Sequence, residues 1–252
     1  MQAFRLLAPK VGRMRYTLGV LALLLCPTGV RAQLRDVTDQ QPPPGRIRGQ
    51  AGGWLEYAAP TGDFGRFVHD GFGLTGWGGW VLDRGGRVTI GLELGIVNYG
   101  DRTRTVPLSP TIPGLYADVT TTNNIVTLGA PVVRVDLTRG TVRPYVSGSV
   151  GAAYFYTQTS ARGTSSGGAF ASSTNFSDWT FNWSAGAGVA IQLSRGKHPI
   201  ALDFGVRHRD NARVQYLNEN SIQGTGAGTT VTPIESEANL TVWGLGVVFG
   251  LR

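Results

Sequence analysis

The sequence has few of the residues that build metal, redox or nucleophilic sites. Of its 252 residues only one is cysteine, Cys26, and three are histidine. A single thiol cannot form an internal disulfide, and three scattered histidines without cysteine make no ligand set for a metal. The chain also has no phosphate-binding loop and no dinucleotide fingerprint after a strand. We therefore expect no cofactor and no metal site.

Beyond its first residues the chain also lacks a long apolar run. Four basic residues precede the apolar run Tyr16–Leu25, and Val30-Arg31-Ala32 follows. This order is typical of a secretory signal peptide, so we predict that residues 1–32 form one and that cleavage follows Ala32. A transmembrane anchor is the first alternative, but the apolar run is shorter than the roughly 20 residues that a spanning helix needs. A lipoprotein signal ending at Cys26 is the second, but it would need a small residue in place of Leu25. Residues 33–46 contain three consecutive prolines and are expected to form a short periplasmic tail.

The excess of positive charge falls largely within the predicted signal peptide. Five of the 23 basic residues and none of the 16 acidic residues lie in residues 1–32, so the remainder has a net charge of 18 − 16, or +2. Such a balance does not indicate binding to nucleic acid. If the protein enters a membrane, the missing apolar segments mean that it must do so with strands.

The chain does have strong alternation, clearest in the segment Trp179–Ser194, WTFNWSAGAGVAIQLS. Its odd positions are apolar, and its even positions are mostly glycine, serine, asparagine and glutamine. A period of two indicates an extended strand, and this one is longer than the roughly 5 to 6 residues usual in soluble proteins. Small polar residues suit an enclosed interior, so the pattern favours a barrel whose apolar face points outward into lipid.

Seven further segments alternate in the same way. The expected strands are 48–59, 68–82, a third from Val88, then 125–137, 142–157, 179–194, 200–214 and 240–251. Short links carry Arg-Gly at 84–85, 139–140 and 195–196, while long loops are expected at 101–124, 158–178 and 218–238. The sequence therefore predicts an all-β fold over residues 47–252, an eight-stranded antiparallel up-and-down transmembrane β-barrel with short turns at the periplasmic end. A soluble lipocalin-like ligand carrier, with the alternation inverted, is the alternative.

The outward aromatic residues gather toward the strand ends. Phe72, Trp179, Phe181 and Trp243 are expected near the loop end, and Trp80 and Phe249 near the turn end. Aromatic girdles at both membrane interfaces have this arrangement.

Three stretches carry a resemblance to a known family. They are Gly53–Phe64 (GWLEYAAPTGDF), the segment from Ala130-Pro131 to Arg143-Pro144-Tyr145, and the terminal strand. Over roughly residues 48–252 the chain resembles the small eight-stranded outer-membrane barrels, which include OmpA-type transmembrane domains, OmpX and the opacity-like proteins. The resemblance implies an outer-membrane location, contact with envelope lipids including lipopolysaccharide, and a last strand read by the barrel assembly machinery. The residues of that strand are Trp243, Leu245, Val247, Phe249 and Leu251, although Arg252 rather than an aromatic residue ends the chain.

The resemblance also implies a barrel interior filled by side chains. Parity places four acids and four bases there, which are Glu56, Glu93, Arg134, Asp136, Arg143, Asp203, Arg207 and Arg209. An unpaired buried charge is costly, so we predict a structural salt-bridge network, with a gated ion path as the alternative.

Catalysis and lipid contact are the remaining hypotheses. Barrel enzymes that deacylate lipid A use a His-x-Ser pair, but His69, His198 and His208 have no serine two residues on. We therefore expect no enzyme but a structural or surface-interaction role through the loops, and keep a lipid A-modifying enzyme as the alternative. A basic cluster near the loop end, Arg207, His208, Arg209 and Arg213, is a hypothetical contact for lipid phosphate, although parity points Arg207 and Arg209 to the lumen.

Overall fold

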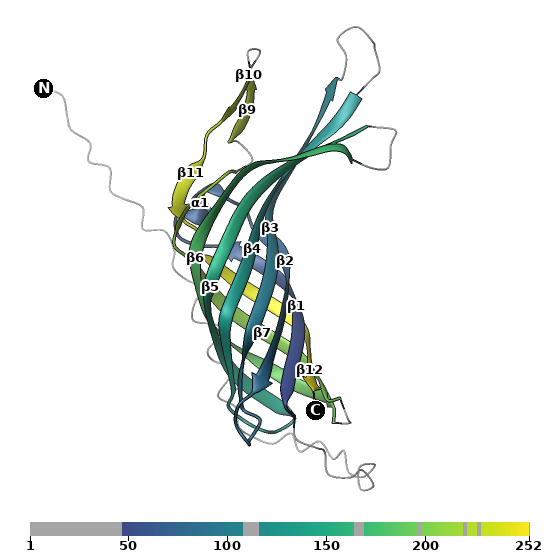
Figure 1. The fold of residues 1–252 in the computed structure, drawn as a ribbon, viewed down its shortest axis with the longest axis vertical. Helices are drawn as coiled ribbons and strands as arrows, with labels where there is room; N and C mark the ends of the chain where they lie inside the picture. The colour runs from purple at the N-terminus through teal and green to yellow at the C-terminus, as the bar shows by residue number, and fades with distance from the viewer. Residues whose placement is uncertain are drawn as a thin grey trace, which may run out of the picture. The chain divides into compact units, whose positions relative to one another are not determined.

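Eight strands close into a ring in the computed structural model, which describes residues 47–107, 116–163, 169–195, 198–218, 221–225 and 228–251 (Figure 1). The predicted signal peptide (1–32) and tail (33–46) lie outside the described residues. The barrel strands are β1 (Gly49–Pro60), β2 (Gly71–Val81), β3 (Val88–Pro107), β4 (Tyr116–Asp136), β5 (Val142–Gly163), β6 (Ala169–Ser194), β7 (Ile200–Asn211) and β12 (Leu240–Leu251). Their order, β1-β12-β7-β6-β5-β4-β3-β2, and their antiparallel pairing confirm the predicted eight-stranded up-and-down barrel.

Residues that alternate in the sequence point to opposite faces of the barrel wall. In β6 the side chains of Trp179 and Leu193 are 64% and 65% exposed, whereas Asn182 and Ala190 are buried. Around the ring the large exposed side chains of the wall are mostly apolar, whereas the charged residues of the wall are buried inside. A soluble ligand carrier requires the opposite arrangement, so the lipocalin-like alternative is wrong.

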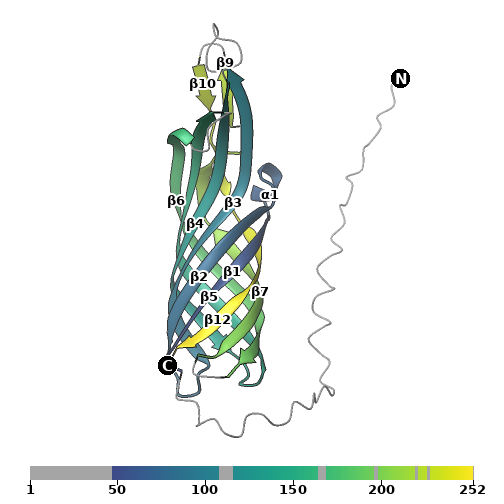
Figure 2. The same ribbon diagram turned by 90° about the vertical axis from the view of Figure 1, so that its right-hand side faces the viewer.

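Two predicted loops, 101–124 and 158–178, are wrong over most of their length. β3 continues to Pro107 and β4 begins at Tyr116, while β5 continues to Gly163 and β6 begins at Ala169. Figure 2 shows these long strands running beyond the level of β1 and β2. Apolar alternation disappears there because both faces of the sheet are polar and much of it is exposed. Cross-strand hydroxyl contacts hold it instead, such as Thr103 to Thr120 at 2.9 Å and Thr121 to Thr159 at 3.1 Å.

The third predicted loop, 218–238, contains short strands. The expected seventh strand ends early, at Asn211, and is followed by β8 (Arg213–Tyr216), β9 (Ile222–Thr225), β10 (Gly228–Val231) and β11 (Ile234–Glu237). β8 pairs with β11, and β9 pairs with β10. The inward side chain of Asn211 donates its Nδ2 hydrogen to the carbonyl of Ala238, which ties the end of β7 to the segment that returns into β12.

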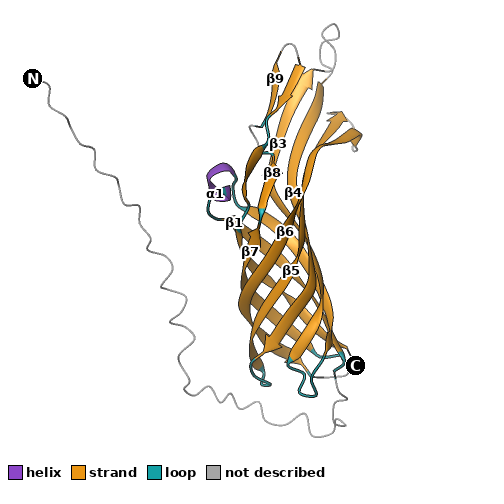
Figure 3. Ribbon diagram, turned by 60° about the vertical axis from the view of Figure 1, so that its left-hand side comes forward, coloured by secondary structure: helices purple, strands orange, loops and turns teal. Residues whose placement is uncertain are grey.

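The expected turn after the first strand holds one helical turn, α1 (Phe64–Phe67), whose Phe64 is fully buried. Among the described residues no helix is long and apolar enough to span a membrane. The two ends of the barrel differ, as Figure 3 shows. The links β2–β3, β4–β5 and β6–β7 are short and lie at one end, the turn end, where Gly49 pairs with Leu251. The extended hairpins and α1 lie at the other end, the loop end.

Candidate functional site

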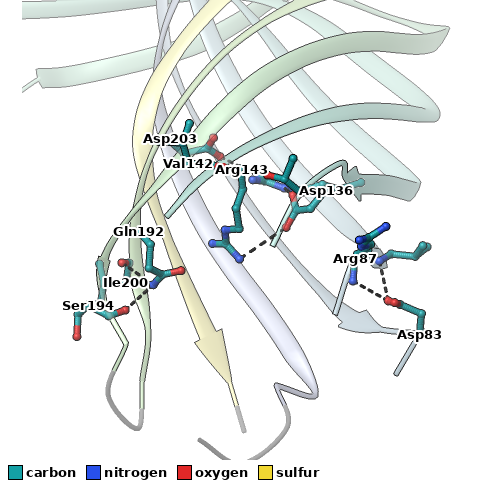
Figure 4. A network of polar contacts seen from close by, with 12 residues as sticks. Asp83, Arg87, Asp136, Val142, Arg143, Gln192, Ser194, Ile200 and Asp203 are labelled. Atoms are coloured by element: carbon teal, nitrogen blue, oxygen red, sulfur yellow. Dashed lines mark hydrogen bonds and ion pairs between the residues drawn. The ribbon is translucent and has the colours of Figure 1, made fainter. Parts of the chain in front are cut away.

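The turn-end half of the lumen holds a network of charges centred on Arg134. Its Nε lies 3.0 Å from Oδ1 of Asp136, and its Nη1 lies 2.8 Å from Oδ2 of Asp203. Arg143, at the mouth of the barrel, approaches the second oxygen of Asp136 at 3.7 Å (Figure 4). Three strands, β4, β5 and β7, thus supply a chain of alternating charges across the lumen.

Two further ion pairs lie closer to the loop end. Arg207 binds Glu93, whose other oxygen accepts a hydrogen bond of 3.1 Å from the hydroxyl of Ser149. Arg209, which is fully buried, lies 3.4 Å from Glu56. All eight charged residues that parity assigned to the lumen are therefore inside it, and each takes part in at least one ion pair. Their role as a structural network remains a prediction.

Aromatic rings fill the space between these charges. The indole nitrogen of Trp54 donates to Asp203 at 3.0 Å, and the guanidinium of Arg134 lies 3.6 Å from the ring centroid of Tyr145. Glycines on neighbouring strands make room for them: a Cβ on Gly244 would meet the Trp54 ring at 2.7 Å. A cavity of about 10 Å³ remains beside Trp54 and Tyr145, space for about one water molecule. This half of the lumen is filled with side chains.

The loop-end half of the lumen is closed by an apolar cluster that the sequence analysis missed. Phe64 of α1 lies at its centre, with ring centroids 4.9 Å from Tyr216, 5.5 Å from Tyr99 and 6.3 Å from Phe155. The cluster, called here the apolar plug, consists of Ala58, Phe64, Val68, Val97, Tyr99, Ile125, Ala153, Phe155, Val214, Tyr216, Ala238, Leu240 and Val242. The available signal was the inward parity of Val97, Tyr99 and Phe155, which continues that of the lumen residues before them on β3 and β5.

The predicted girdle residues lie on the outer surface. Tyr57 of β1 is opposite both Phe72 of β2 and Trp243 of β12, which forms an aromatic row at the loop end of these strands. Trp179 packs on Tyr154 with centroids 4.6 Å apart. Exposure is 70% for Phe72, 64% for Trp179, 57% for Phe181, 70% for Trp80 and 40% for Phe249. Trp80 and Phe249 lie toward the turn end, and the sequence analysis overlooked Tyr57 and Tyr154.

The proposed basic contact for lipid phosphate is wrong for two of its members. Arg207 and Arg209 are buried in ion pairs inside the barrel, because they occupy inward positions of β7. Arg213 is exposed and lies 3.7 Å from Glu235 on β11. His208 points outward, with its ring edge-on to Trp183 at a centroid distance of 6.3 Å.

The remaining histidines are exposed, with His69 in the β1–β2 connection and His198 in the β6–β7 turn. In the part of the chain that the structure describes, no group of three or more His, Cys, Asp or Glu side chains could hold a metal ion.

Four strands continue past the barrel at the loop end and form one sheet. The pairing of β2 with β3 ends at Phe72 and Asn98, and the pairing of β6 with β7 begins only at Asn182 and Asn211. Beyond those points the described part of β3 pairs only with β4. That of β6 pairs as a strand only with β5, although the carbonyl of Phe181 accepts a hydrogen bond of 3.0 Å from the N–H of Ala212. We call this extension, formed by residues 100–107, 116–123, 157–163 and 169–177, the projecting sheet.

The last strand closes the ring by pairing with both β1 and β7. Its outward side chains are those expected to carry the assembly signal. Trp243 is half-buried, and Leu245, Val247, Phe249 and Leu251 are exposed.

Comparison with known proteins gives similarity of fold only. No protein-family model and no curated protein sequence matches the chain. Among solved structures, Neisserial surface protein A is 14% identical with a TM-score of 0.39, over 82% of this chain and 96% of that one. Ail, the attachment invasion locus protein of Yersinia pestis, solved with the heparin analogue sucrose octasulfate, is 13% identical with a TM-score of 0.32, over 82% and 98%.

The translocator domain of the autotransporter NalP from Neisseria meningitidis is 12% identical with a TM-score of 0.30, over 85% of this chain and 90% of that one. Identities below 25% and TM-scores below 0.5 assign no function. The barrel architecture expected from the family resemblance is the one that the chain has.

Proposed function

We propose that the chain is an integral outer-membrane β-barrel that carries the projecting sheet on the cell surface, where the sheet serves for interaction with other molecules. The observation that carries this proposal is the reversal of polarity across the barrel wall. Leu55 and Phe72 are 70% exposed on the outside, whereas Glu56 and Arg209 are buried inside. Such a wall is stable only where the exterior meets lipid.

The filled lumen supports a role as an anchor rather than as a pore or an enzyme. Ion pairs close its turn-end half and the apolar plug closes its loop-end half, so a water-filled path does not run through the barrel. A lipid A-modifying enzyme has no comparable support, because the described histidines lie apart from one another on the exterior and in the connections.

The projecting sheet is the part suited to contact other molecules. Among the described residues its outer strands, β3 and β6, have no further strand partner there, and another extended segment can add to the edge of an exposed sheet. Envelope lipids, including lipopolysaccharide, contact the outer wall in this proposal, and the assembly machinery binds the last strand from Trp243 to Leu251.

Cysteine labelling tests both the location and the orientation, because Cys26 is the only cysteine of the chain and lies in the predicted signal peptide. Ser172→Cys places a thiol on the projecting sheet, and Gly140→Cys places one in a short turn where an added Cβ has space. We expect a membrane-impermeant maleimide to label Ser172→Cys, but not Gly140→Cys, on intact cells. Equal labelling, or recovery of the protein in the soluble periplasm without a heat-modifiable gel shift, would contradict the proposal.

A further inference from the structure

The three short turns of the barrel share one sequence pattern, Leu-x-Arg-Gly. It occurs as Leu82–Gly85, Leu137–Gly140 and Leu193–Gly196, although Gly196 lies outside the described residues. The three leucines are 60%, 53% and 65% exposed, and the arginine two residues later is exposed in each turn. At three places around the ring, therefore, the apolar outer wall ends in a leucine, and an arginine lies two residues further along the chain.

The turn end of the barrel is positively charged and the loop end is not. Among the described residues outside the lumen, five arginines and one aspartate lie at the turn end, namely Arg48, Arg84, Arg87, Arg139, Arg195 and Asp83. The loop end has five arginines and eight acids, namely Arg66, Arg102, Arg104, Arg162, Arg213, Asp63, Asp70, Asp101, Asp118, Asp178, Asp210, Glu235 and Glu237. The formal charges are therefore 5 − 1, or +4, and 5 − 8, or −3.

Contacts between neighbouring turns place these guanidinium groups along the rim. Arg195 donates from Nη2 to the hydroxyl of Thr141 in the β4–β5 turn at 2.7 Å. Arg139 of that turn reaches the β2–β3 turn, where its Nη2 lies beside Gly85. Asp83, the one acid, accepts hydrogen bonds from the backbone N–H groups of Arg87 and Val88 at 2.7 and 2.8 Å (Figure 4). Each arginine has five N–H donors, so these contacts leave others for a ligand.

We propose that this basic rim binds phospholipids whose headgroup has a net negative charge, through the headgroup phosphate, in the membrane leaflet at the turn end. Guanidinium groups bind phosphate through paired hydrogen bonds, and phosphate is the charged group found directly beyond the acyl region of a bilayer. Arg84, Arg139 and Arg195, each two residues beyond an outward-facing leucine, lie at that level. The inference rests on the proposed membrane location but is independent of what the projecting sheet binds.

Native mass spectrometry of the refolded protein tests the proposal. The protein, in detergent micelles, is offered phosphatidylglycerol or phosphatidylcholine with the same acyl chains, and the retained lipid is counted. We expect wild type to retain several-fold more phosphatidylglycerol than phosphatidylcholine. The triple variant Arg84→Gln, Arg139→Gln, Arg195→Gln should retain the two lipids equally, whereas the matched loop-end triple Arg66→Gln, Arg104→Gln, Arg213→Gln should keep the preference.

Three results would overturn the proposal: no preference in wild type, a preference that survives the turn-end triple, or equal loss in the loop-end triple. Displacement of phosphatidylglycerol by inorganic phosphate at the same phosphate concentration would show a site for free phosphate instead. If the turn-end triple does not fold, salt titration of wild type decides, since added salt screens exposed charges and should weaken an electrostatic preference. A wild-type barrel that gives the heat-modifiable gel shift without any lipid preference would refute the rim site and leave the proposed function intact.

Discussion

The two halves of the lumen are filled by the same strands in opposite ways. On β1 the inward residue Glu56 belongs to the ion-pair network, and the next inward residue, Ala58, belongs to the apolar plug. On β3 the same change occurs between Glu93 and Val97. Ion pairs depend on exact partners, because one missing partner leaves an uncompensated buried charge, whereas apolar packing depends on buried volume. The barrel is thus closed twice, by two independent kinds of interaction.

The largest expected effect comes from removing the centre of the charged half. Arg134→Met leaves Asp136 with the more distant Arg143 and deprives Asp203 of its one ion-pair partner among the described residues. We expect the free energy of unfolding, measured by urea titration in lipid vesicles, to fall by about 4 kcal/mol. Arg104→Met on the projecting sheet is the control and should change it by less than about 0.5 kcal/mol. A loss below about 1 kcal/mol for Arg134→Met would show that the network is solvated.

The apolar plug should respond to loss of volume instead of loss of charge. Phe64→Ala removes the ring that packs on Tyr99, Phe155 and Tyr216, and we expect a loss of about 3 kcal/mol in the same titration. The loss should not depend on ionic strength. Phe67→Ala, which truncates an exposed ring in the same helical turn, should have little effect. Equal effects of the two variants would mean that Phe64 does not hold the plug together.

A double variant converts part of the charged half into apolar packing. Arg209→Met alone leaves Glu56 buried without its partner, so it should be strongly destabilising. Adding Glu56→Leu removes the unpaired carboxylate, and we expect the free energy of unfolding of the double variant to lie within about 1 kcal/mol of that of wild type. The double-mutant cycle measures the coupling directly. Additive losses from the two substitutions would refute the buried pair.

The smallest expected effect on stability comes from the carboxylate of Asp83, which lies outside the lumen and can be compared with the carboxylates inside it. Hydrogen bonds from the backbone N–H groups of Val88 and Arg87 lower the pKa of Asp83 below its ordinary value. A lowered pKa in the folded state stabilises the fold above the unfolded pKa of about 3.9, and this contribution is lost as the pH falls through the folded value. NMR titration of the Asp83 carboxyl carbon should show the lowered pKa. At a pH below the pKa of Asp83 in the folded protein, Asp83→Asn should have the same free energy of unfolding as wild type. An ordinary pKa for Asp83 in the NMR titration would contradict the hydrogen bonds of the turn.

The charged half could be predicted from the sequence and the apolar plug could not. Most lumen charges, such as Glu93 and Asp203, stand alone at an alternating position between apolar neighbours, and Arg209, between His208 and Asp210, continues the same parity along its strand. Parity therefore assigns them to the interior. Phe64 lies in a segment expected to be a turn, and Tyr216 lies where the alternation of the seventh strand has ended. Their burial follows from α1 and β8 reaching over the barrel, which is tertiary packing that no local period records.

The projecting sheet escaped prediction for a related reason. Its Thr and Ser residues pair across strands through backbone and hydroxyl groups, and an exposed sheet has no apolar face to impose a period of two. The last strand and the short turns, by contrast, were located correctly because apolar alternation runs up to their ends.

Ion conductance across a planar lipid bilayer tests the double closure most directly. We expect wild-type protein, inserted at high salt, to add no discrete conductance steps, because the ion-pair network and the apolar plug each block the lumen. Regular conductance steps from the wild-type protein would contradict the filled lumen and the role as an anchor for the projecting sheet.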